Sequence, residues 1–141
     1  MSSKQLTSSL EDYIEVISNN LKQHQKVRAI DISRELNVSR ASVSEALKRL
    51  ADMGLINYSR YDVISITEEG EKAAQKVINR HNLLKSFFTE ILGLEENEAA
   101  ENACRIEHVI TENVYDKLTG YMEFNREHPE FAQSFLSSKR K

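Results

Sequence analysis

The sequence predicts a mainly α-helical protein that begins with a winged helix-turn-helix, whose wing is a small β-hairpin, and continues as a second helical region. Three observations support this fold class. The 141 residues include only four Gly and one Pro. Apolar residues recur mostly at the three- and four-residue spacing of amphipathic helices. Just one stretch shows two short strand-like segments around a turn.

The composition is that of an ordinary globular protein, with 40% hydrophobic and 29% charged residues. No apolar run has the length of a membrane span, and the N-terminus lacks the apolar core of a signal peptide. We therefore expect a cytoplasmic protein without a membrane partner. The net charge is −3, but the stretch from Lys26 to Tyr61 holds seven Lys or Arg against four Asp or Glu. This basic middle of an acidic chain favours a nucleic-acid contact.

The first expected helix covers about residues 9–23, where apolar side chains keep helical spacing. Residues 29–50 then read as two short helices joined by a tight turn at Asn37-Val38, with Ser39 as the N-cap of the second helix. This is the pattern of a helix-turn-helix, although two helices with a short turn also occur in proteins that do not bind DNA. The second helix should bury Val43, Ala46, Leu47 and Leu50. The exposed residues expected to contact DNA are Ser39, Arg40, Ser42, Glu45, Lys48 and Arg49.

A β-hairpin is expected directly after the second of these helices. Gly54 is placed to end that helix in the left-handed conformation. The segments Leu55–Tyr58 and Val63–Thr67 read as short strands on either side of a turn that contains Arg60. A recognition helix followed by a hairpin is the winged-helix arrangement, and Arg60 at the wing tip would touch a DNA phosphate.

The second half of the chain predicts four more helices. Thr67 should cap a helix of about 25 residues that ends at Gly93, and a further helix is expected over Glu95–Ile110. Another begins at Thr111, and the last begins at Pro129. Their apolar stripes exceed what so small a helical layer needs for its own core, so we expect a homodimer interface here.

A cluster of possible metal ligands lies within the helix at Glu95–Ile110. Cys104, Glu107 and His108 stand at positions i, i+3 and i+4, so on a helix they share one face. A thiolate, a carboxylate and an imidazole together suit a divalent transition metal. His81 lies about one helix upstream, although a single helical His is more often an ordinary polar residue. The lone cysteine cannot form an internal disulfide, so it is a buried hydrophobe, a reactive thiol or a ligand.

At this point the chain, from Leu10 to about Asn125, resembles the diphtheria toxin repressor family of metal-dependent regulators. Two segments are the most specific, Arg80-His81-Asn82-Leu83-Leu84 and Glu101-Asn102-Ala103-Cys104-Arg105-Ile106-Glu107-His108-Val109. The second segment is similar to the iron-responsive branch, which has a Cys at this place. Asp12 and Glu15 are similar to the manganese transport regulator branch; on composition alone they would read as acids favoured by the helix dipole.

The resemblance implies a homodimeric repressor that binds operator DNA when loaded with Fe(II) or Mn(II). Its implied metal ligands are Asp12, Glu15, His81, Cys104, Glu107 and His108. The manganese branch has a carboxylate where Cys104 stands, which leaves one or two ions per subunit open. The iron branch's ancillary site would need a carboxylate at Lys85 and an imidazole at Ala100, so we do not expect that site.

These inferences combine into one functional expectation. Residues 1–72 would form a winged helix-turn-helix DNA-binding domain, and residues 73–141 a helical metal-binding and dimerisation domain. The protein would repress transcription to control iron or manganese homeostasis, with Zn(II) or Co(II) also able to bind in vitro. The alternative is a winged-helix regulator that responds to an organic ligand or to oxidation of Cys104. An enzyme is not expected, because the chain lacks a His-Glu-x-x-His pair and a Gly-rich phosphate loop.

Overall fold

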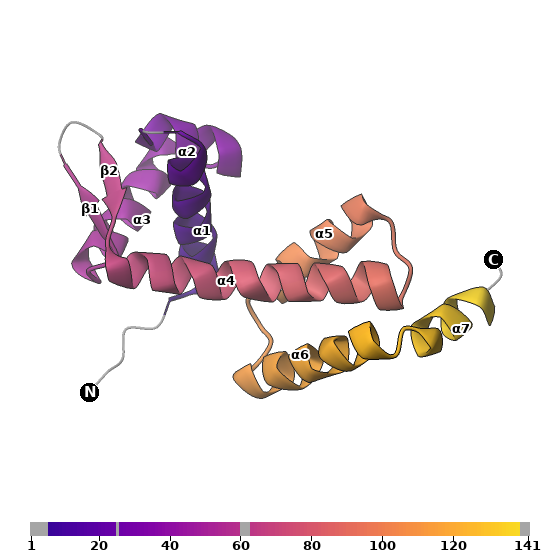
Figure 1. Cartoon of the computed structure of the whole chain (residues 1–141). Coiled ribbons are helices and arrows are strands. Elements are labelled where there is room, and N and C mark those ends of the chain that lie inside the picture. Colours follow the sequence, from indigo (N-terminus) through magenta and orange to yellow (C-terminus); the bar gives the residue numbers. More distant parts are fainter. Residues whose placement is uncertain (1–5, 25, 60–62, 139–141) are drawn as a thin grey trace. The chain divides into compact units, whose positions relative to one another are not determined.

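The computed structural model describes residues 6–24, 26–59 and 63–138 of the chain, which form helices and one β-hairpin (Figure 1). The chain divides into two compact units, Met1–Val77 and Ile78–Lys141. The predicted fold class, mainly helical with an N-terminal winged helix-turn-helix, is confirmed. None of the described helices combines the length and the apolar character that a membrane span requires.

The first unit is built around three helices, α1 (Ser8–Gln23), α2 (Ala29–Leu36) and α3 (Arg40–Asp52). Helix α1 begins one residue earlier than expected because Thr7 is its cap: the Thr7 hydroxyl accepts a hydrogen bond from the Leu10 N–H at 3.1 Å. The apolar stripes of the three helices meet in one core. Its fully buried members include Ile14, Ile17, Ile32, Val43, Leu47 and Leu50.

The turn between α2 and α3 follows the sequence prediction closely. Asn37 ends α2 in the left-handed conformation, with φ of +56°. The Ser33 hydroxyl donates to the carbonyl of Val38 at 2.6 Å, which holds the turn. Ser39 then caps α3, because its side-chain oxygen accepts from the Ser42 N–H at 3.0 Å. Helices α2 and α3 therefore pack as a helix-turn-helix.

The hairpin begins where α3 ends. Gly54 has a φ of +79°, its N–H donates to the Ala51 carbonyl at 2.9 Å, and the Leu55 N–H donates to the Leu50 carbonyl at 3.0 Å. These two bonds form a Schellman motif, which turns the chain out of the helix. Because Leu55 closes α3 and Thr67 opens the next helix, the two antiparallel strands are shorter than expected. They are β1 (Ile56–Tyr58) and β2 (Ile64–Ile66), with Ile56 opposite Ile66.

Helix α4 (Glu68–Ser86) runs from the end of the hairpin, and the boundary between the two units falls within it. Thr67 caps α4 as predicted, since its hydroxyl oxygen accepts from the Gly70 N–H at 3.0 Å. The helix continues as a π-helical turn, η1 (Phe87–Ile91), in which the Leu92 N–H donates to the Phe87 carbonyl at 3.3 Å. The expected long helix is present, but its last turn is widened.

The second unit also contains α5 (Glu96–Ile106), α6 (Glu112–Glu127) and α7 (Glu130–Ser138). The expectation that α5 reaches Ile110 is wrong. Thr111 caps α6 by accepting from the Val114 N–H at 3.2 Å, so the preceding residues are needed for the connection. A small buried cluster of Ile91, Met122 and Ala132 forms part of the core of this unit, and Leu84, Ala99 and Ala103 are buried as well.

Candidate metal centre and DNA-contact surface

The centre of the candidate metal site is Glu107, which is 0% exposed. It is the C-cap of α5 and still donates its N–H to the Ala103 carbonyl at 2.8 Å. Its backbone is still helical, and it follows the buried Ala99 and Ala103 at four-residue spacing, so the carboxylate projects from the buried face of α5. A carboxylate is rarely buried to this extent unless it is paired or binds a metal.

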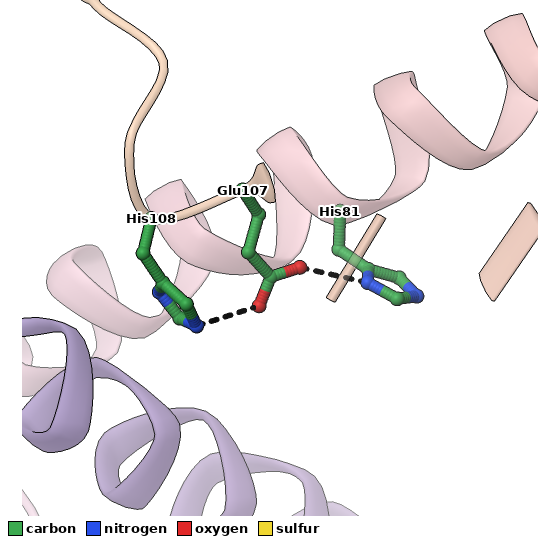
Figure 2. A network of polar contacts seen from close by, with 3 residues as sticks. All are labelled: His81, Glu107 and His108. Atoms are coloured by element: carbon green, nitrogen blue, oxygen red, sulfur yellow. Dashed lines mark hydrogen bonds and ion pairs between the residues drawn. The ribbon is translucent and has the colours of Figure 1, made fainter. Parts of the chain in front are cut away.

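Two histidines face the two oxygens of this carboxylate (Figure 2). His81 Nδ1 lies 2.7 Å from Glu107 Oε1, and His108 Nε2 lies 3.4 Å from Glu107 Oε2. The His81 and His108 side chains are only 19% and 9% exposed. Among the described residues, Oε2 has no hydrogen-bond partner, so the 3.4 Å contact leaves this buried oxygen incompletely satisfied.

Cys104 completes a three-donor group with His81 and Glu107. One ligand atom from each of these residues lies within 4.8 Å of the other two. Bonds from Zn(II) to such donors are about 2.0–2.3 Å long, so donors at this separation can surround a single ion of similar size with small side-chain movements. Cys104 is exposed, which excludes the reading of its thiol as a buried hydrophobe. The donor types and the unsatisfied oxygen of Glu107 both fit a divalent transition metal.

The remaining two predicted ligands belong to the first unit. Asp12 and Glu15 lie one turn apart on α1, whereas the other four predicted ligands lie in the second unit. Burial and the negative charge of Asp12 raise the pKa of the neighbouring Tyr13.

A largely exposed ion pair lies at the C-terminal end of α4. Lys85 Nζ is 2.9 Å from Glu96 Oε2. The hydrogen bond from this ammonium, and then its charge, hold the pKa of Glu96 below the ordinary value of a glutamate. The iron branch's ancillary metal site would need a carboxylate at Lys85, and this position carries a side-chain cation paired with Glu96 instead.

The predicted DNA-contact residues on α3 form an exposed polar surface at the N-terminal end and outer face of the helix. All six are exposed, namely Ser39, Arg40, Ser42, Glu45, Lys48 and Arg49. The Ser39 hydroxyl also donates to the Ser42 hydroxyl at 3.0 Å, so these two residues hold the helix start as well as facing solvent. The seventh predicted contact, Arg60, lies outside the described residues.

Two structural features of the first unit were missed from the sequence. A Cβ added at Gly70 would lie 2.0 Å from the Leu55 carbonyl oxygen, so α4 approaches the backbone too closely for any side chain. Ser18 is a buried polar residue whose hydroxyl donates to Glu71. The available signal for Ser18 was a small polar residue within the apolar stripe of α1, four positions after Ile14.

Both halves of the chain match families of known proteins. Residues 5–64 match the family described as iron dependent repressor, N-terminal DNA binding domain. Residues 67–135 match the family described as iron dependent repressor, metal binding and dimerisation domain. This chain belongs to the iron-dependent repressor family. The resemblance found in the sequence is thereby confirmed.

Several relatives support this assignment. The chain is 33% identical over 119 residues to an uncharacterized HTH-type transcriptional regulator of Methanocaldococcus jannaschii, covering 84% of this chain and 95% of the relative. It is 36% identical over 107 residues to the transcriptional regulator MntR of Escherichia coli, covering 76% of this chain and 68% of MntR. These relatives of the iron-dependent repressor family are transcriptional regulators.

One solved structure shows the same fold with a metal bound. It is a manganese-dependent transcriptional repressor in complex with manganese, with a TM-score of 0.76 and 26% identity to this chain. The match covers 82% of this chain and 53% of that one. This member of the iron-dependent repressor family therefore spans about half the length of the solved repressor.

Proposed function

We propose that this protein is a metal-activated transcriptional repressor that binds operator DNA as a homodimer when loaded with Fe(II) or Mn(II), and so controls iron or manganese homeostasis. The observation that carries the proposal is the buried carboxylate of Glu107, which lies between His81 and His108 with the Cys104 thiol nearby. Residues 1–72 would be the DNA-binding domain and residues 73–141 the metal-binding and dimerisation domain. Because the partner would be operator DNA, we propose that the protein acts in the cytoplasm.

The proposed ligand set combines the donors of the second unit with the two acids of α1. It consists of Asp12, Glu15, His81, Cys104, Glu107 and His108. When bound, a divalent cation supplies the positive charge that allows several acidic donors to lie close together. The buried Oε2 of Glu107, which accepts no hydrogen bond within the described chain, supports this role.

The donor types favour iron or manganese as the regulating metal. Carboxylate and imidazole ligands suit Mn(II) and Fe(II), whereas the Cys104 thiolate shifts the preference toward Fe(II), Co(II) or Zn(II). Affinities follow the Irving–Williams order, so Zn(II) and Co(II) should also bind in vitro. The matched solved repressor is manganese-dependent, which keeps Mn(II) in the proposal beside Fe(II).

The proposed response to metal depends on α1. This helix carries Asp12 and Glu15 and packs against α2 and α3 in the first unit. Drawing the two carboxylates to the donors of the second unit would restrict the position of α1 and thereby that of α3, which carries the DNA-contact residues. A coupling of this kind is typically worth about 1–3 kcal/mol, or about a 5- to 150-fold change in operator affinity.

The homodimer is supported by the apolar surface of α6 and α7. Helix α6 buries only Met122 and Asn125 within the chain. The Phe124 and Phe131 rings stack with centroids 5.7 Å apart while both residues stay exposed. A second copy would remove such apolar area from water and would match the two-fold symmetry of most helix-turn-helix binding sites. Other exposed apolar residues on these helices are Val114, Tyr121 and Phe135.

The deciding experiment measures DNA binding at fixed protein concentration with Fe(II), Mn(II), Zn(II), Co(II) or a chelator. The DNA would be selected from a random duplex library with the Mn(II)-loaded wild-type protein, and metal would be counted per protomer. Glu107→Ala and His108→Ala should abolish metal-dependent binding. Glu101→Ala is the matched control, because Glu101 is an exposed acid on α5 that pairs with Arg105. Equal DNA affinity of the wild type with metal and with chelator would reject the proposal.

The alternative, a regulator that responds to an organic ligand or to Cys104 oxidation, is not favoured by the family matches. Cys104→Ser separates the two functions. Metal activation predicts weaker metal binding in this variant, whereas an oxidation sensor predicts unchanged metal binding and loss of the response to peroxide.

A further inference from the structure

A partly buried polar contact joins α1 to α4 inside the first unit. The Ser18 hydroxyl donates to Glu71 Oε1 at 3.2 Å, and Ser18 is 0% exposed. A serine within a helix can satisfy its hydroxyl on the carbonyl four residues earlier in its own helix. Here it bonds instead to a side chain 53 residues away. The contact is therefore a specific link between two helices.

The two linked helices are the ones that carry proposed metal ligands on both sides of the unit boundary. Asp12 lies six residues before Ser18 on α1, about 9 Å along the helix axis at 1.5 Å per residue. His81 lies ten residues after Glu71 on α4, about 15 Å along its axis. Glu15 is nearer, three residues before Ser18 and about 4.5 Å along the axis. The Ser18–Glu71 hydrogen bond thus holds α1 to α4 about one turn beyond Glu15 and nearly two turns beyond Asp12.

We propose that Ser18 and Glu71 are positioning residues that transmit metal occupancy to the DNA-binding surface. This inference rests on the proposed function. A helix held at one point can still rotate about it, whereas a helix held at two separated points has a defined direction. With the Ser18–Glu71 bond as one point and the proposed ligand Asp12 as the more distant other, α1 would take one direction relative to α4, and α3, which packs against α1, would follow it.

The quantity to measure is the coupling ratio, defined as the DNA dissociation constant in chelator divided by that in saturating Mn(II). For the wild type the ratio should lie within about 5- to 150-fold. Ser18→Ala should lower it by about fivefold, equivalent to about 1 kcal/mol, which is the net value of one hydrogen bond. Mn(II) affinity and stoichiometry without DNA should stay the same, because Ser18 and Glu71 are not proposed ligands.

Three further variants make the test specific. Glu71→Gln keeps a side-chain oxygen as acceptor and should preserve the ratio. Glu71→Ala removes the acceptor from the half-buried end of the link and should lower the coupling ratio by the same factor. It also provides the test should Ser18→Ala fail to fold. Asn20→Ala is the matched control, because Asn20 Nδ2 donates to Glu35 Oε1 at 3.1 Å in another contact made by α1, on the exposed side. This variant should leave the ratio unchanged.

The results separate this inference from the proposed function. A normal coupling ratio in both Ser18→Ala and Glu71→Ala overturns the inference and leaves the proposed function intact. An equal loss in Asn20→Ala also overturns it, because general loosening of α1 would then explain the effect. A wild type whose DNA affinity ignores Mn(II) overturns both.

Discussion

The pairing of His81 with Glu107 should be measurable in the metal-free protein. Glu107 is fully buried, and its 2.7 Å contact with His81 Nδ1 is much shorter than the 3.4 Å contact with His108. His81→Ala therefore removes the shorter of these two contacts from a buried carboxylate. A hydrogen bond to an ionised group is worth about 1.5–3 kcal/mol, so the free energy of unfolding should fall by about this amount.

Urea unfolding in the presence of a chelator provides the measurement. The wild type, His81→Ala, Glu107→Ala and the double variant form a double-mutant cycle, whose interaction free energy should be about 1.5–3 kcal/mol. His128→Ala is the control, because the His128 side chain is 48% exposed and lies 3.7 Å from the exposed Glu130. It should cost less than about 1 kcal/mol.

Additive effects of His81→Ala and Glu107→Ala, within about 0.5 kcal/mol, would refute the reasoning, since residues that do not interact behave in this way. The same assay with Mn(II) extends the test. At a free metal concentration of 100 times the dissociation constant, the wild type should gain about 2.7 kcal/mol, and Glu107→Ala should gain nothing comparable.

Three other predictions concern helix packing, surface charge and DNA contact. Gly70→Ala should destabilise the protein by about 1–3 kcal/mol in urea unfolding, because the added Cβ meets the Leu55 carbonyl. Gly120→Ala, in open space within α6, should instead stabilise it by about 0.5–1 kcal/mol. Equal effects of the two substitutions would contradict the close packing at Gly70. Lys85→Ala should raise the pKa of Glu96 toward its ordinary value in an NMR titration. Since the folded pKa is lowered, the stabilisation from this pair is present at neutral pH and is lost as the pH falls through that pKa, so an unchanged pKa would exclude the ion pair. Lys48→Ala should weaken binding to all DNA sequences and reduce the slope of the logarithm of the DNA-binding constant against the logarithm of salt concentration by about one. A loss that differs between DNA sequences would contradict a phosphate contact.

The sequence by itself determined the order and type of the elements, because those signals are local. Thr67 and Thr111 cap helices through bonds to residues three positions later, and Gly54 ends α3 through bonds spanning a few residues. The spacing of apolar residues depends only on helix geometry, so the buried face of α3 was predictable as well. The ligand types in the segment around Cys104 were likewise readable without a structure.

Tertiary packing alone decided how the functional groups meet. Helical spacing puts Glu107 on the face of Ala99 and Ala103, but only the packing of α5 shows that this face is buried and that the carboxylate is enclosed with it. His81 and Glu107 are 26 residues apart, and Ser18 and Glu71 are 53 apart. Periodicity and capping act over about four residues, so they carry no information on contacts at such separations; these depend on which helices pack together and at what rotation.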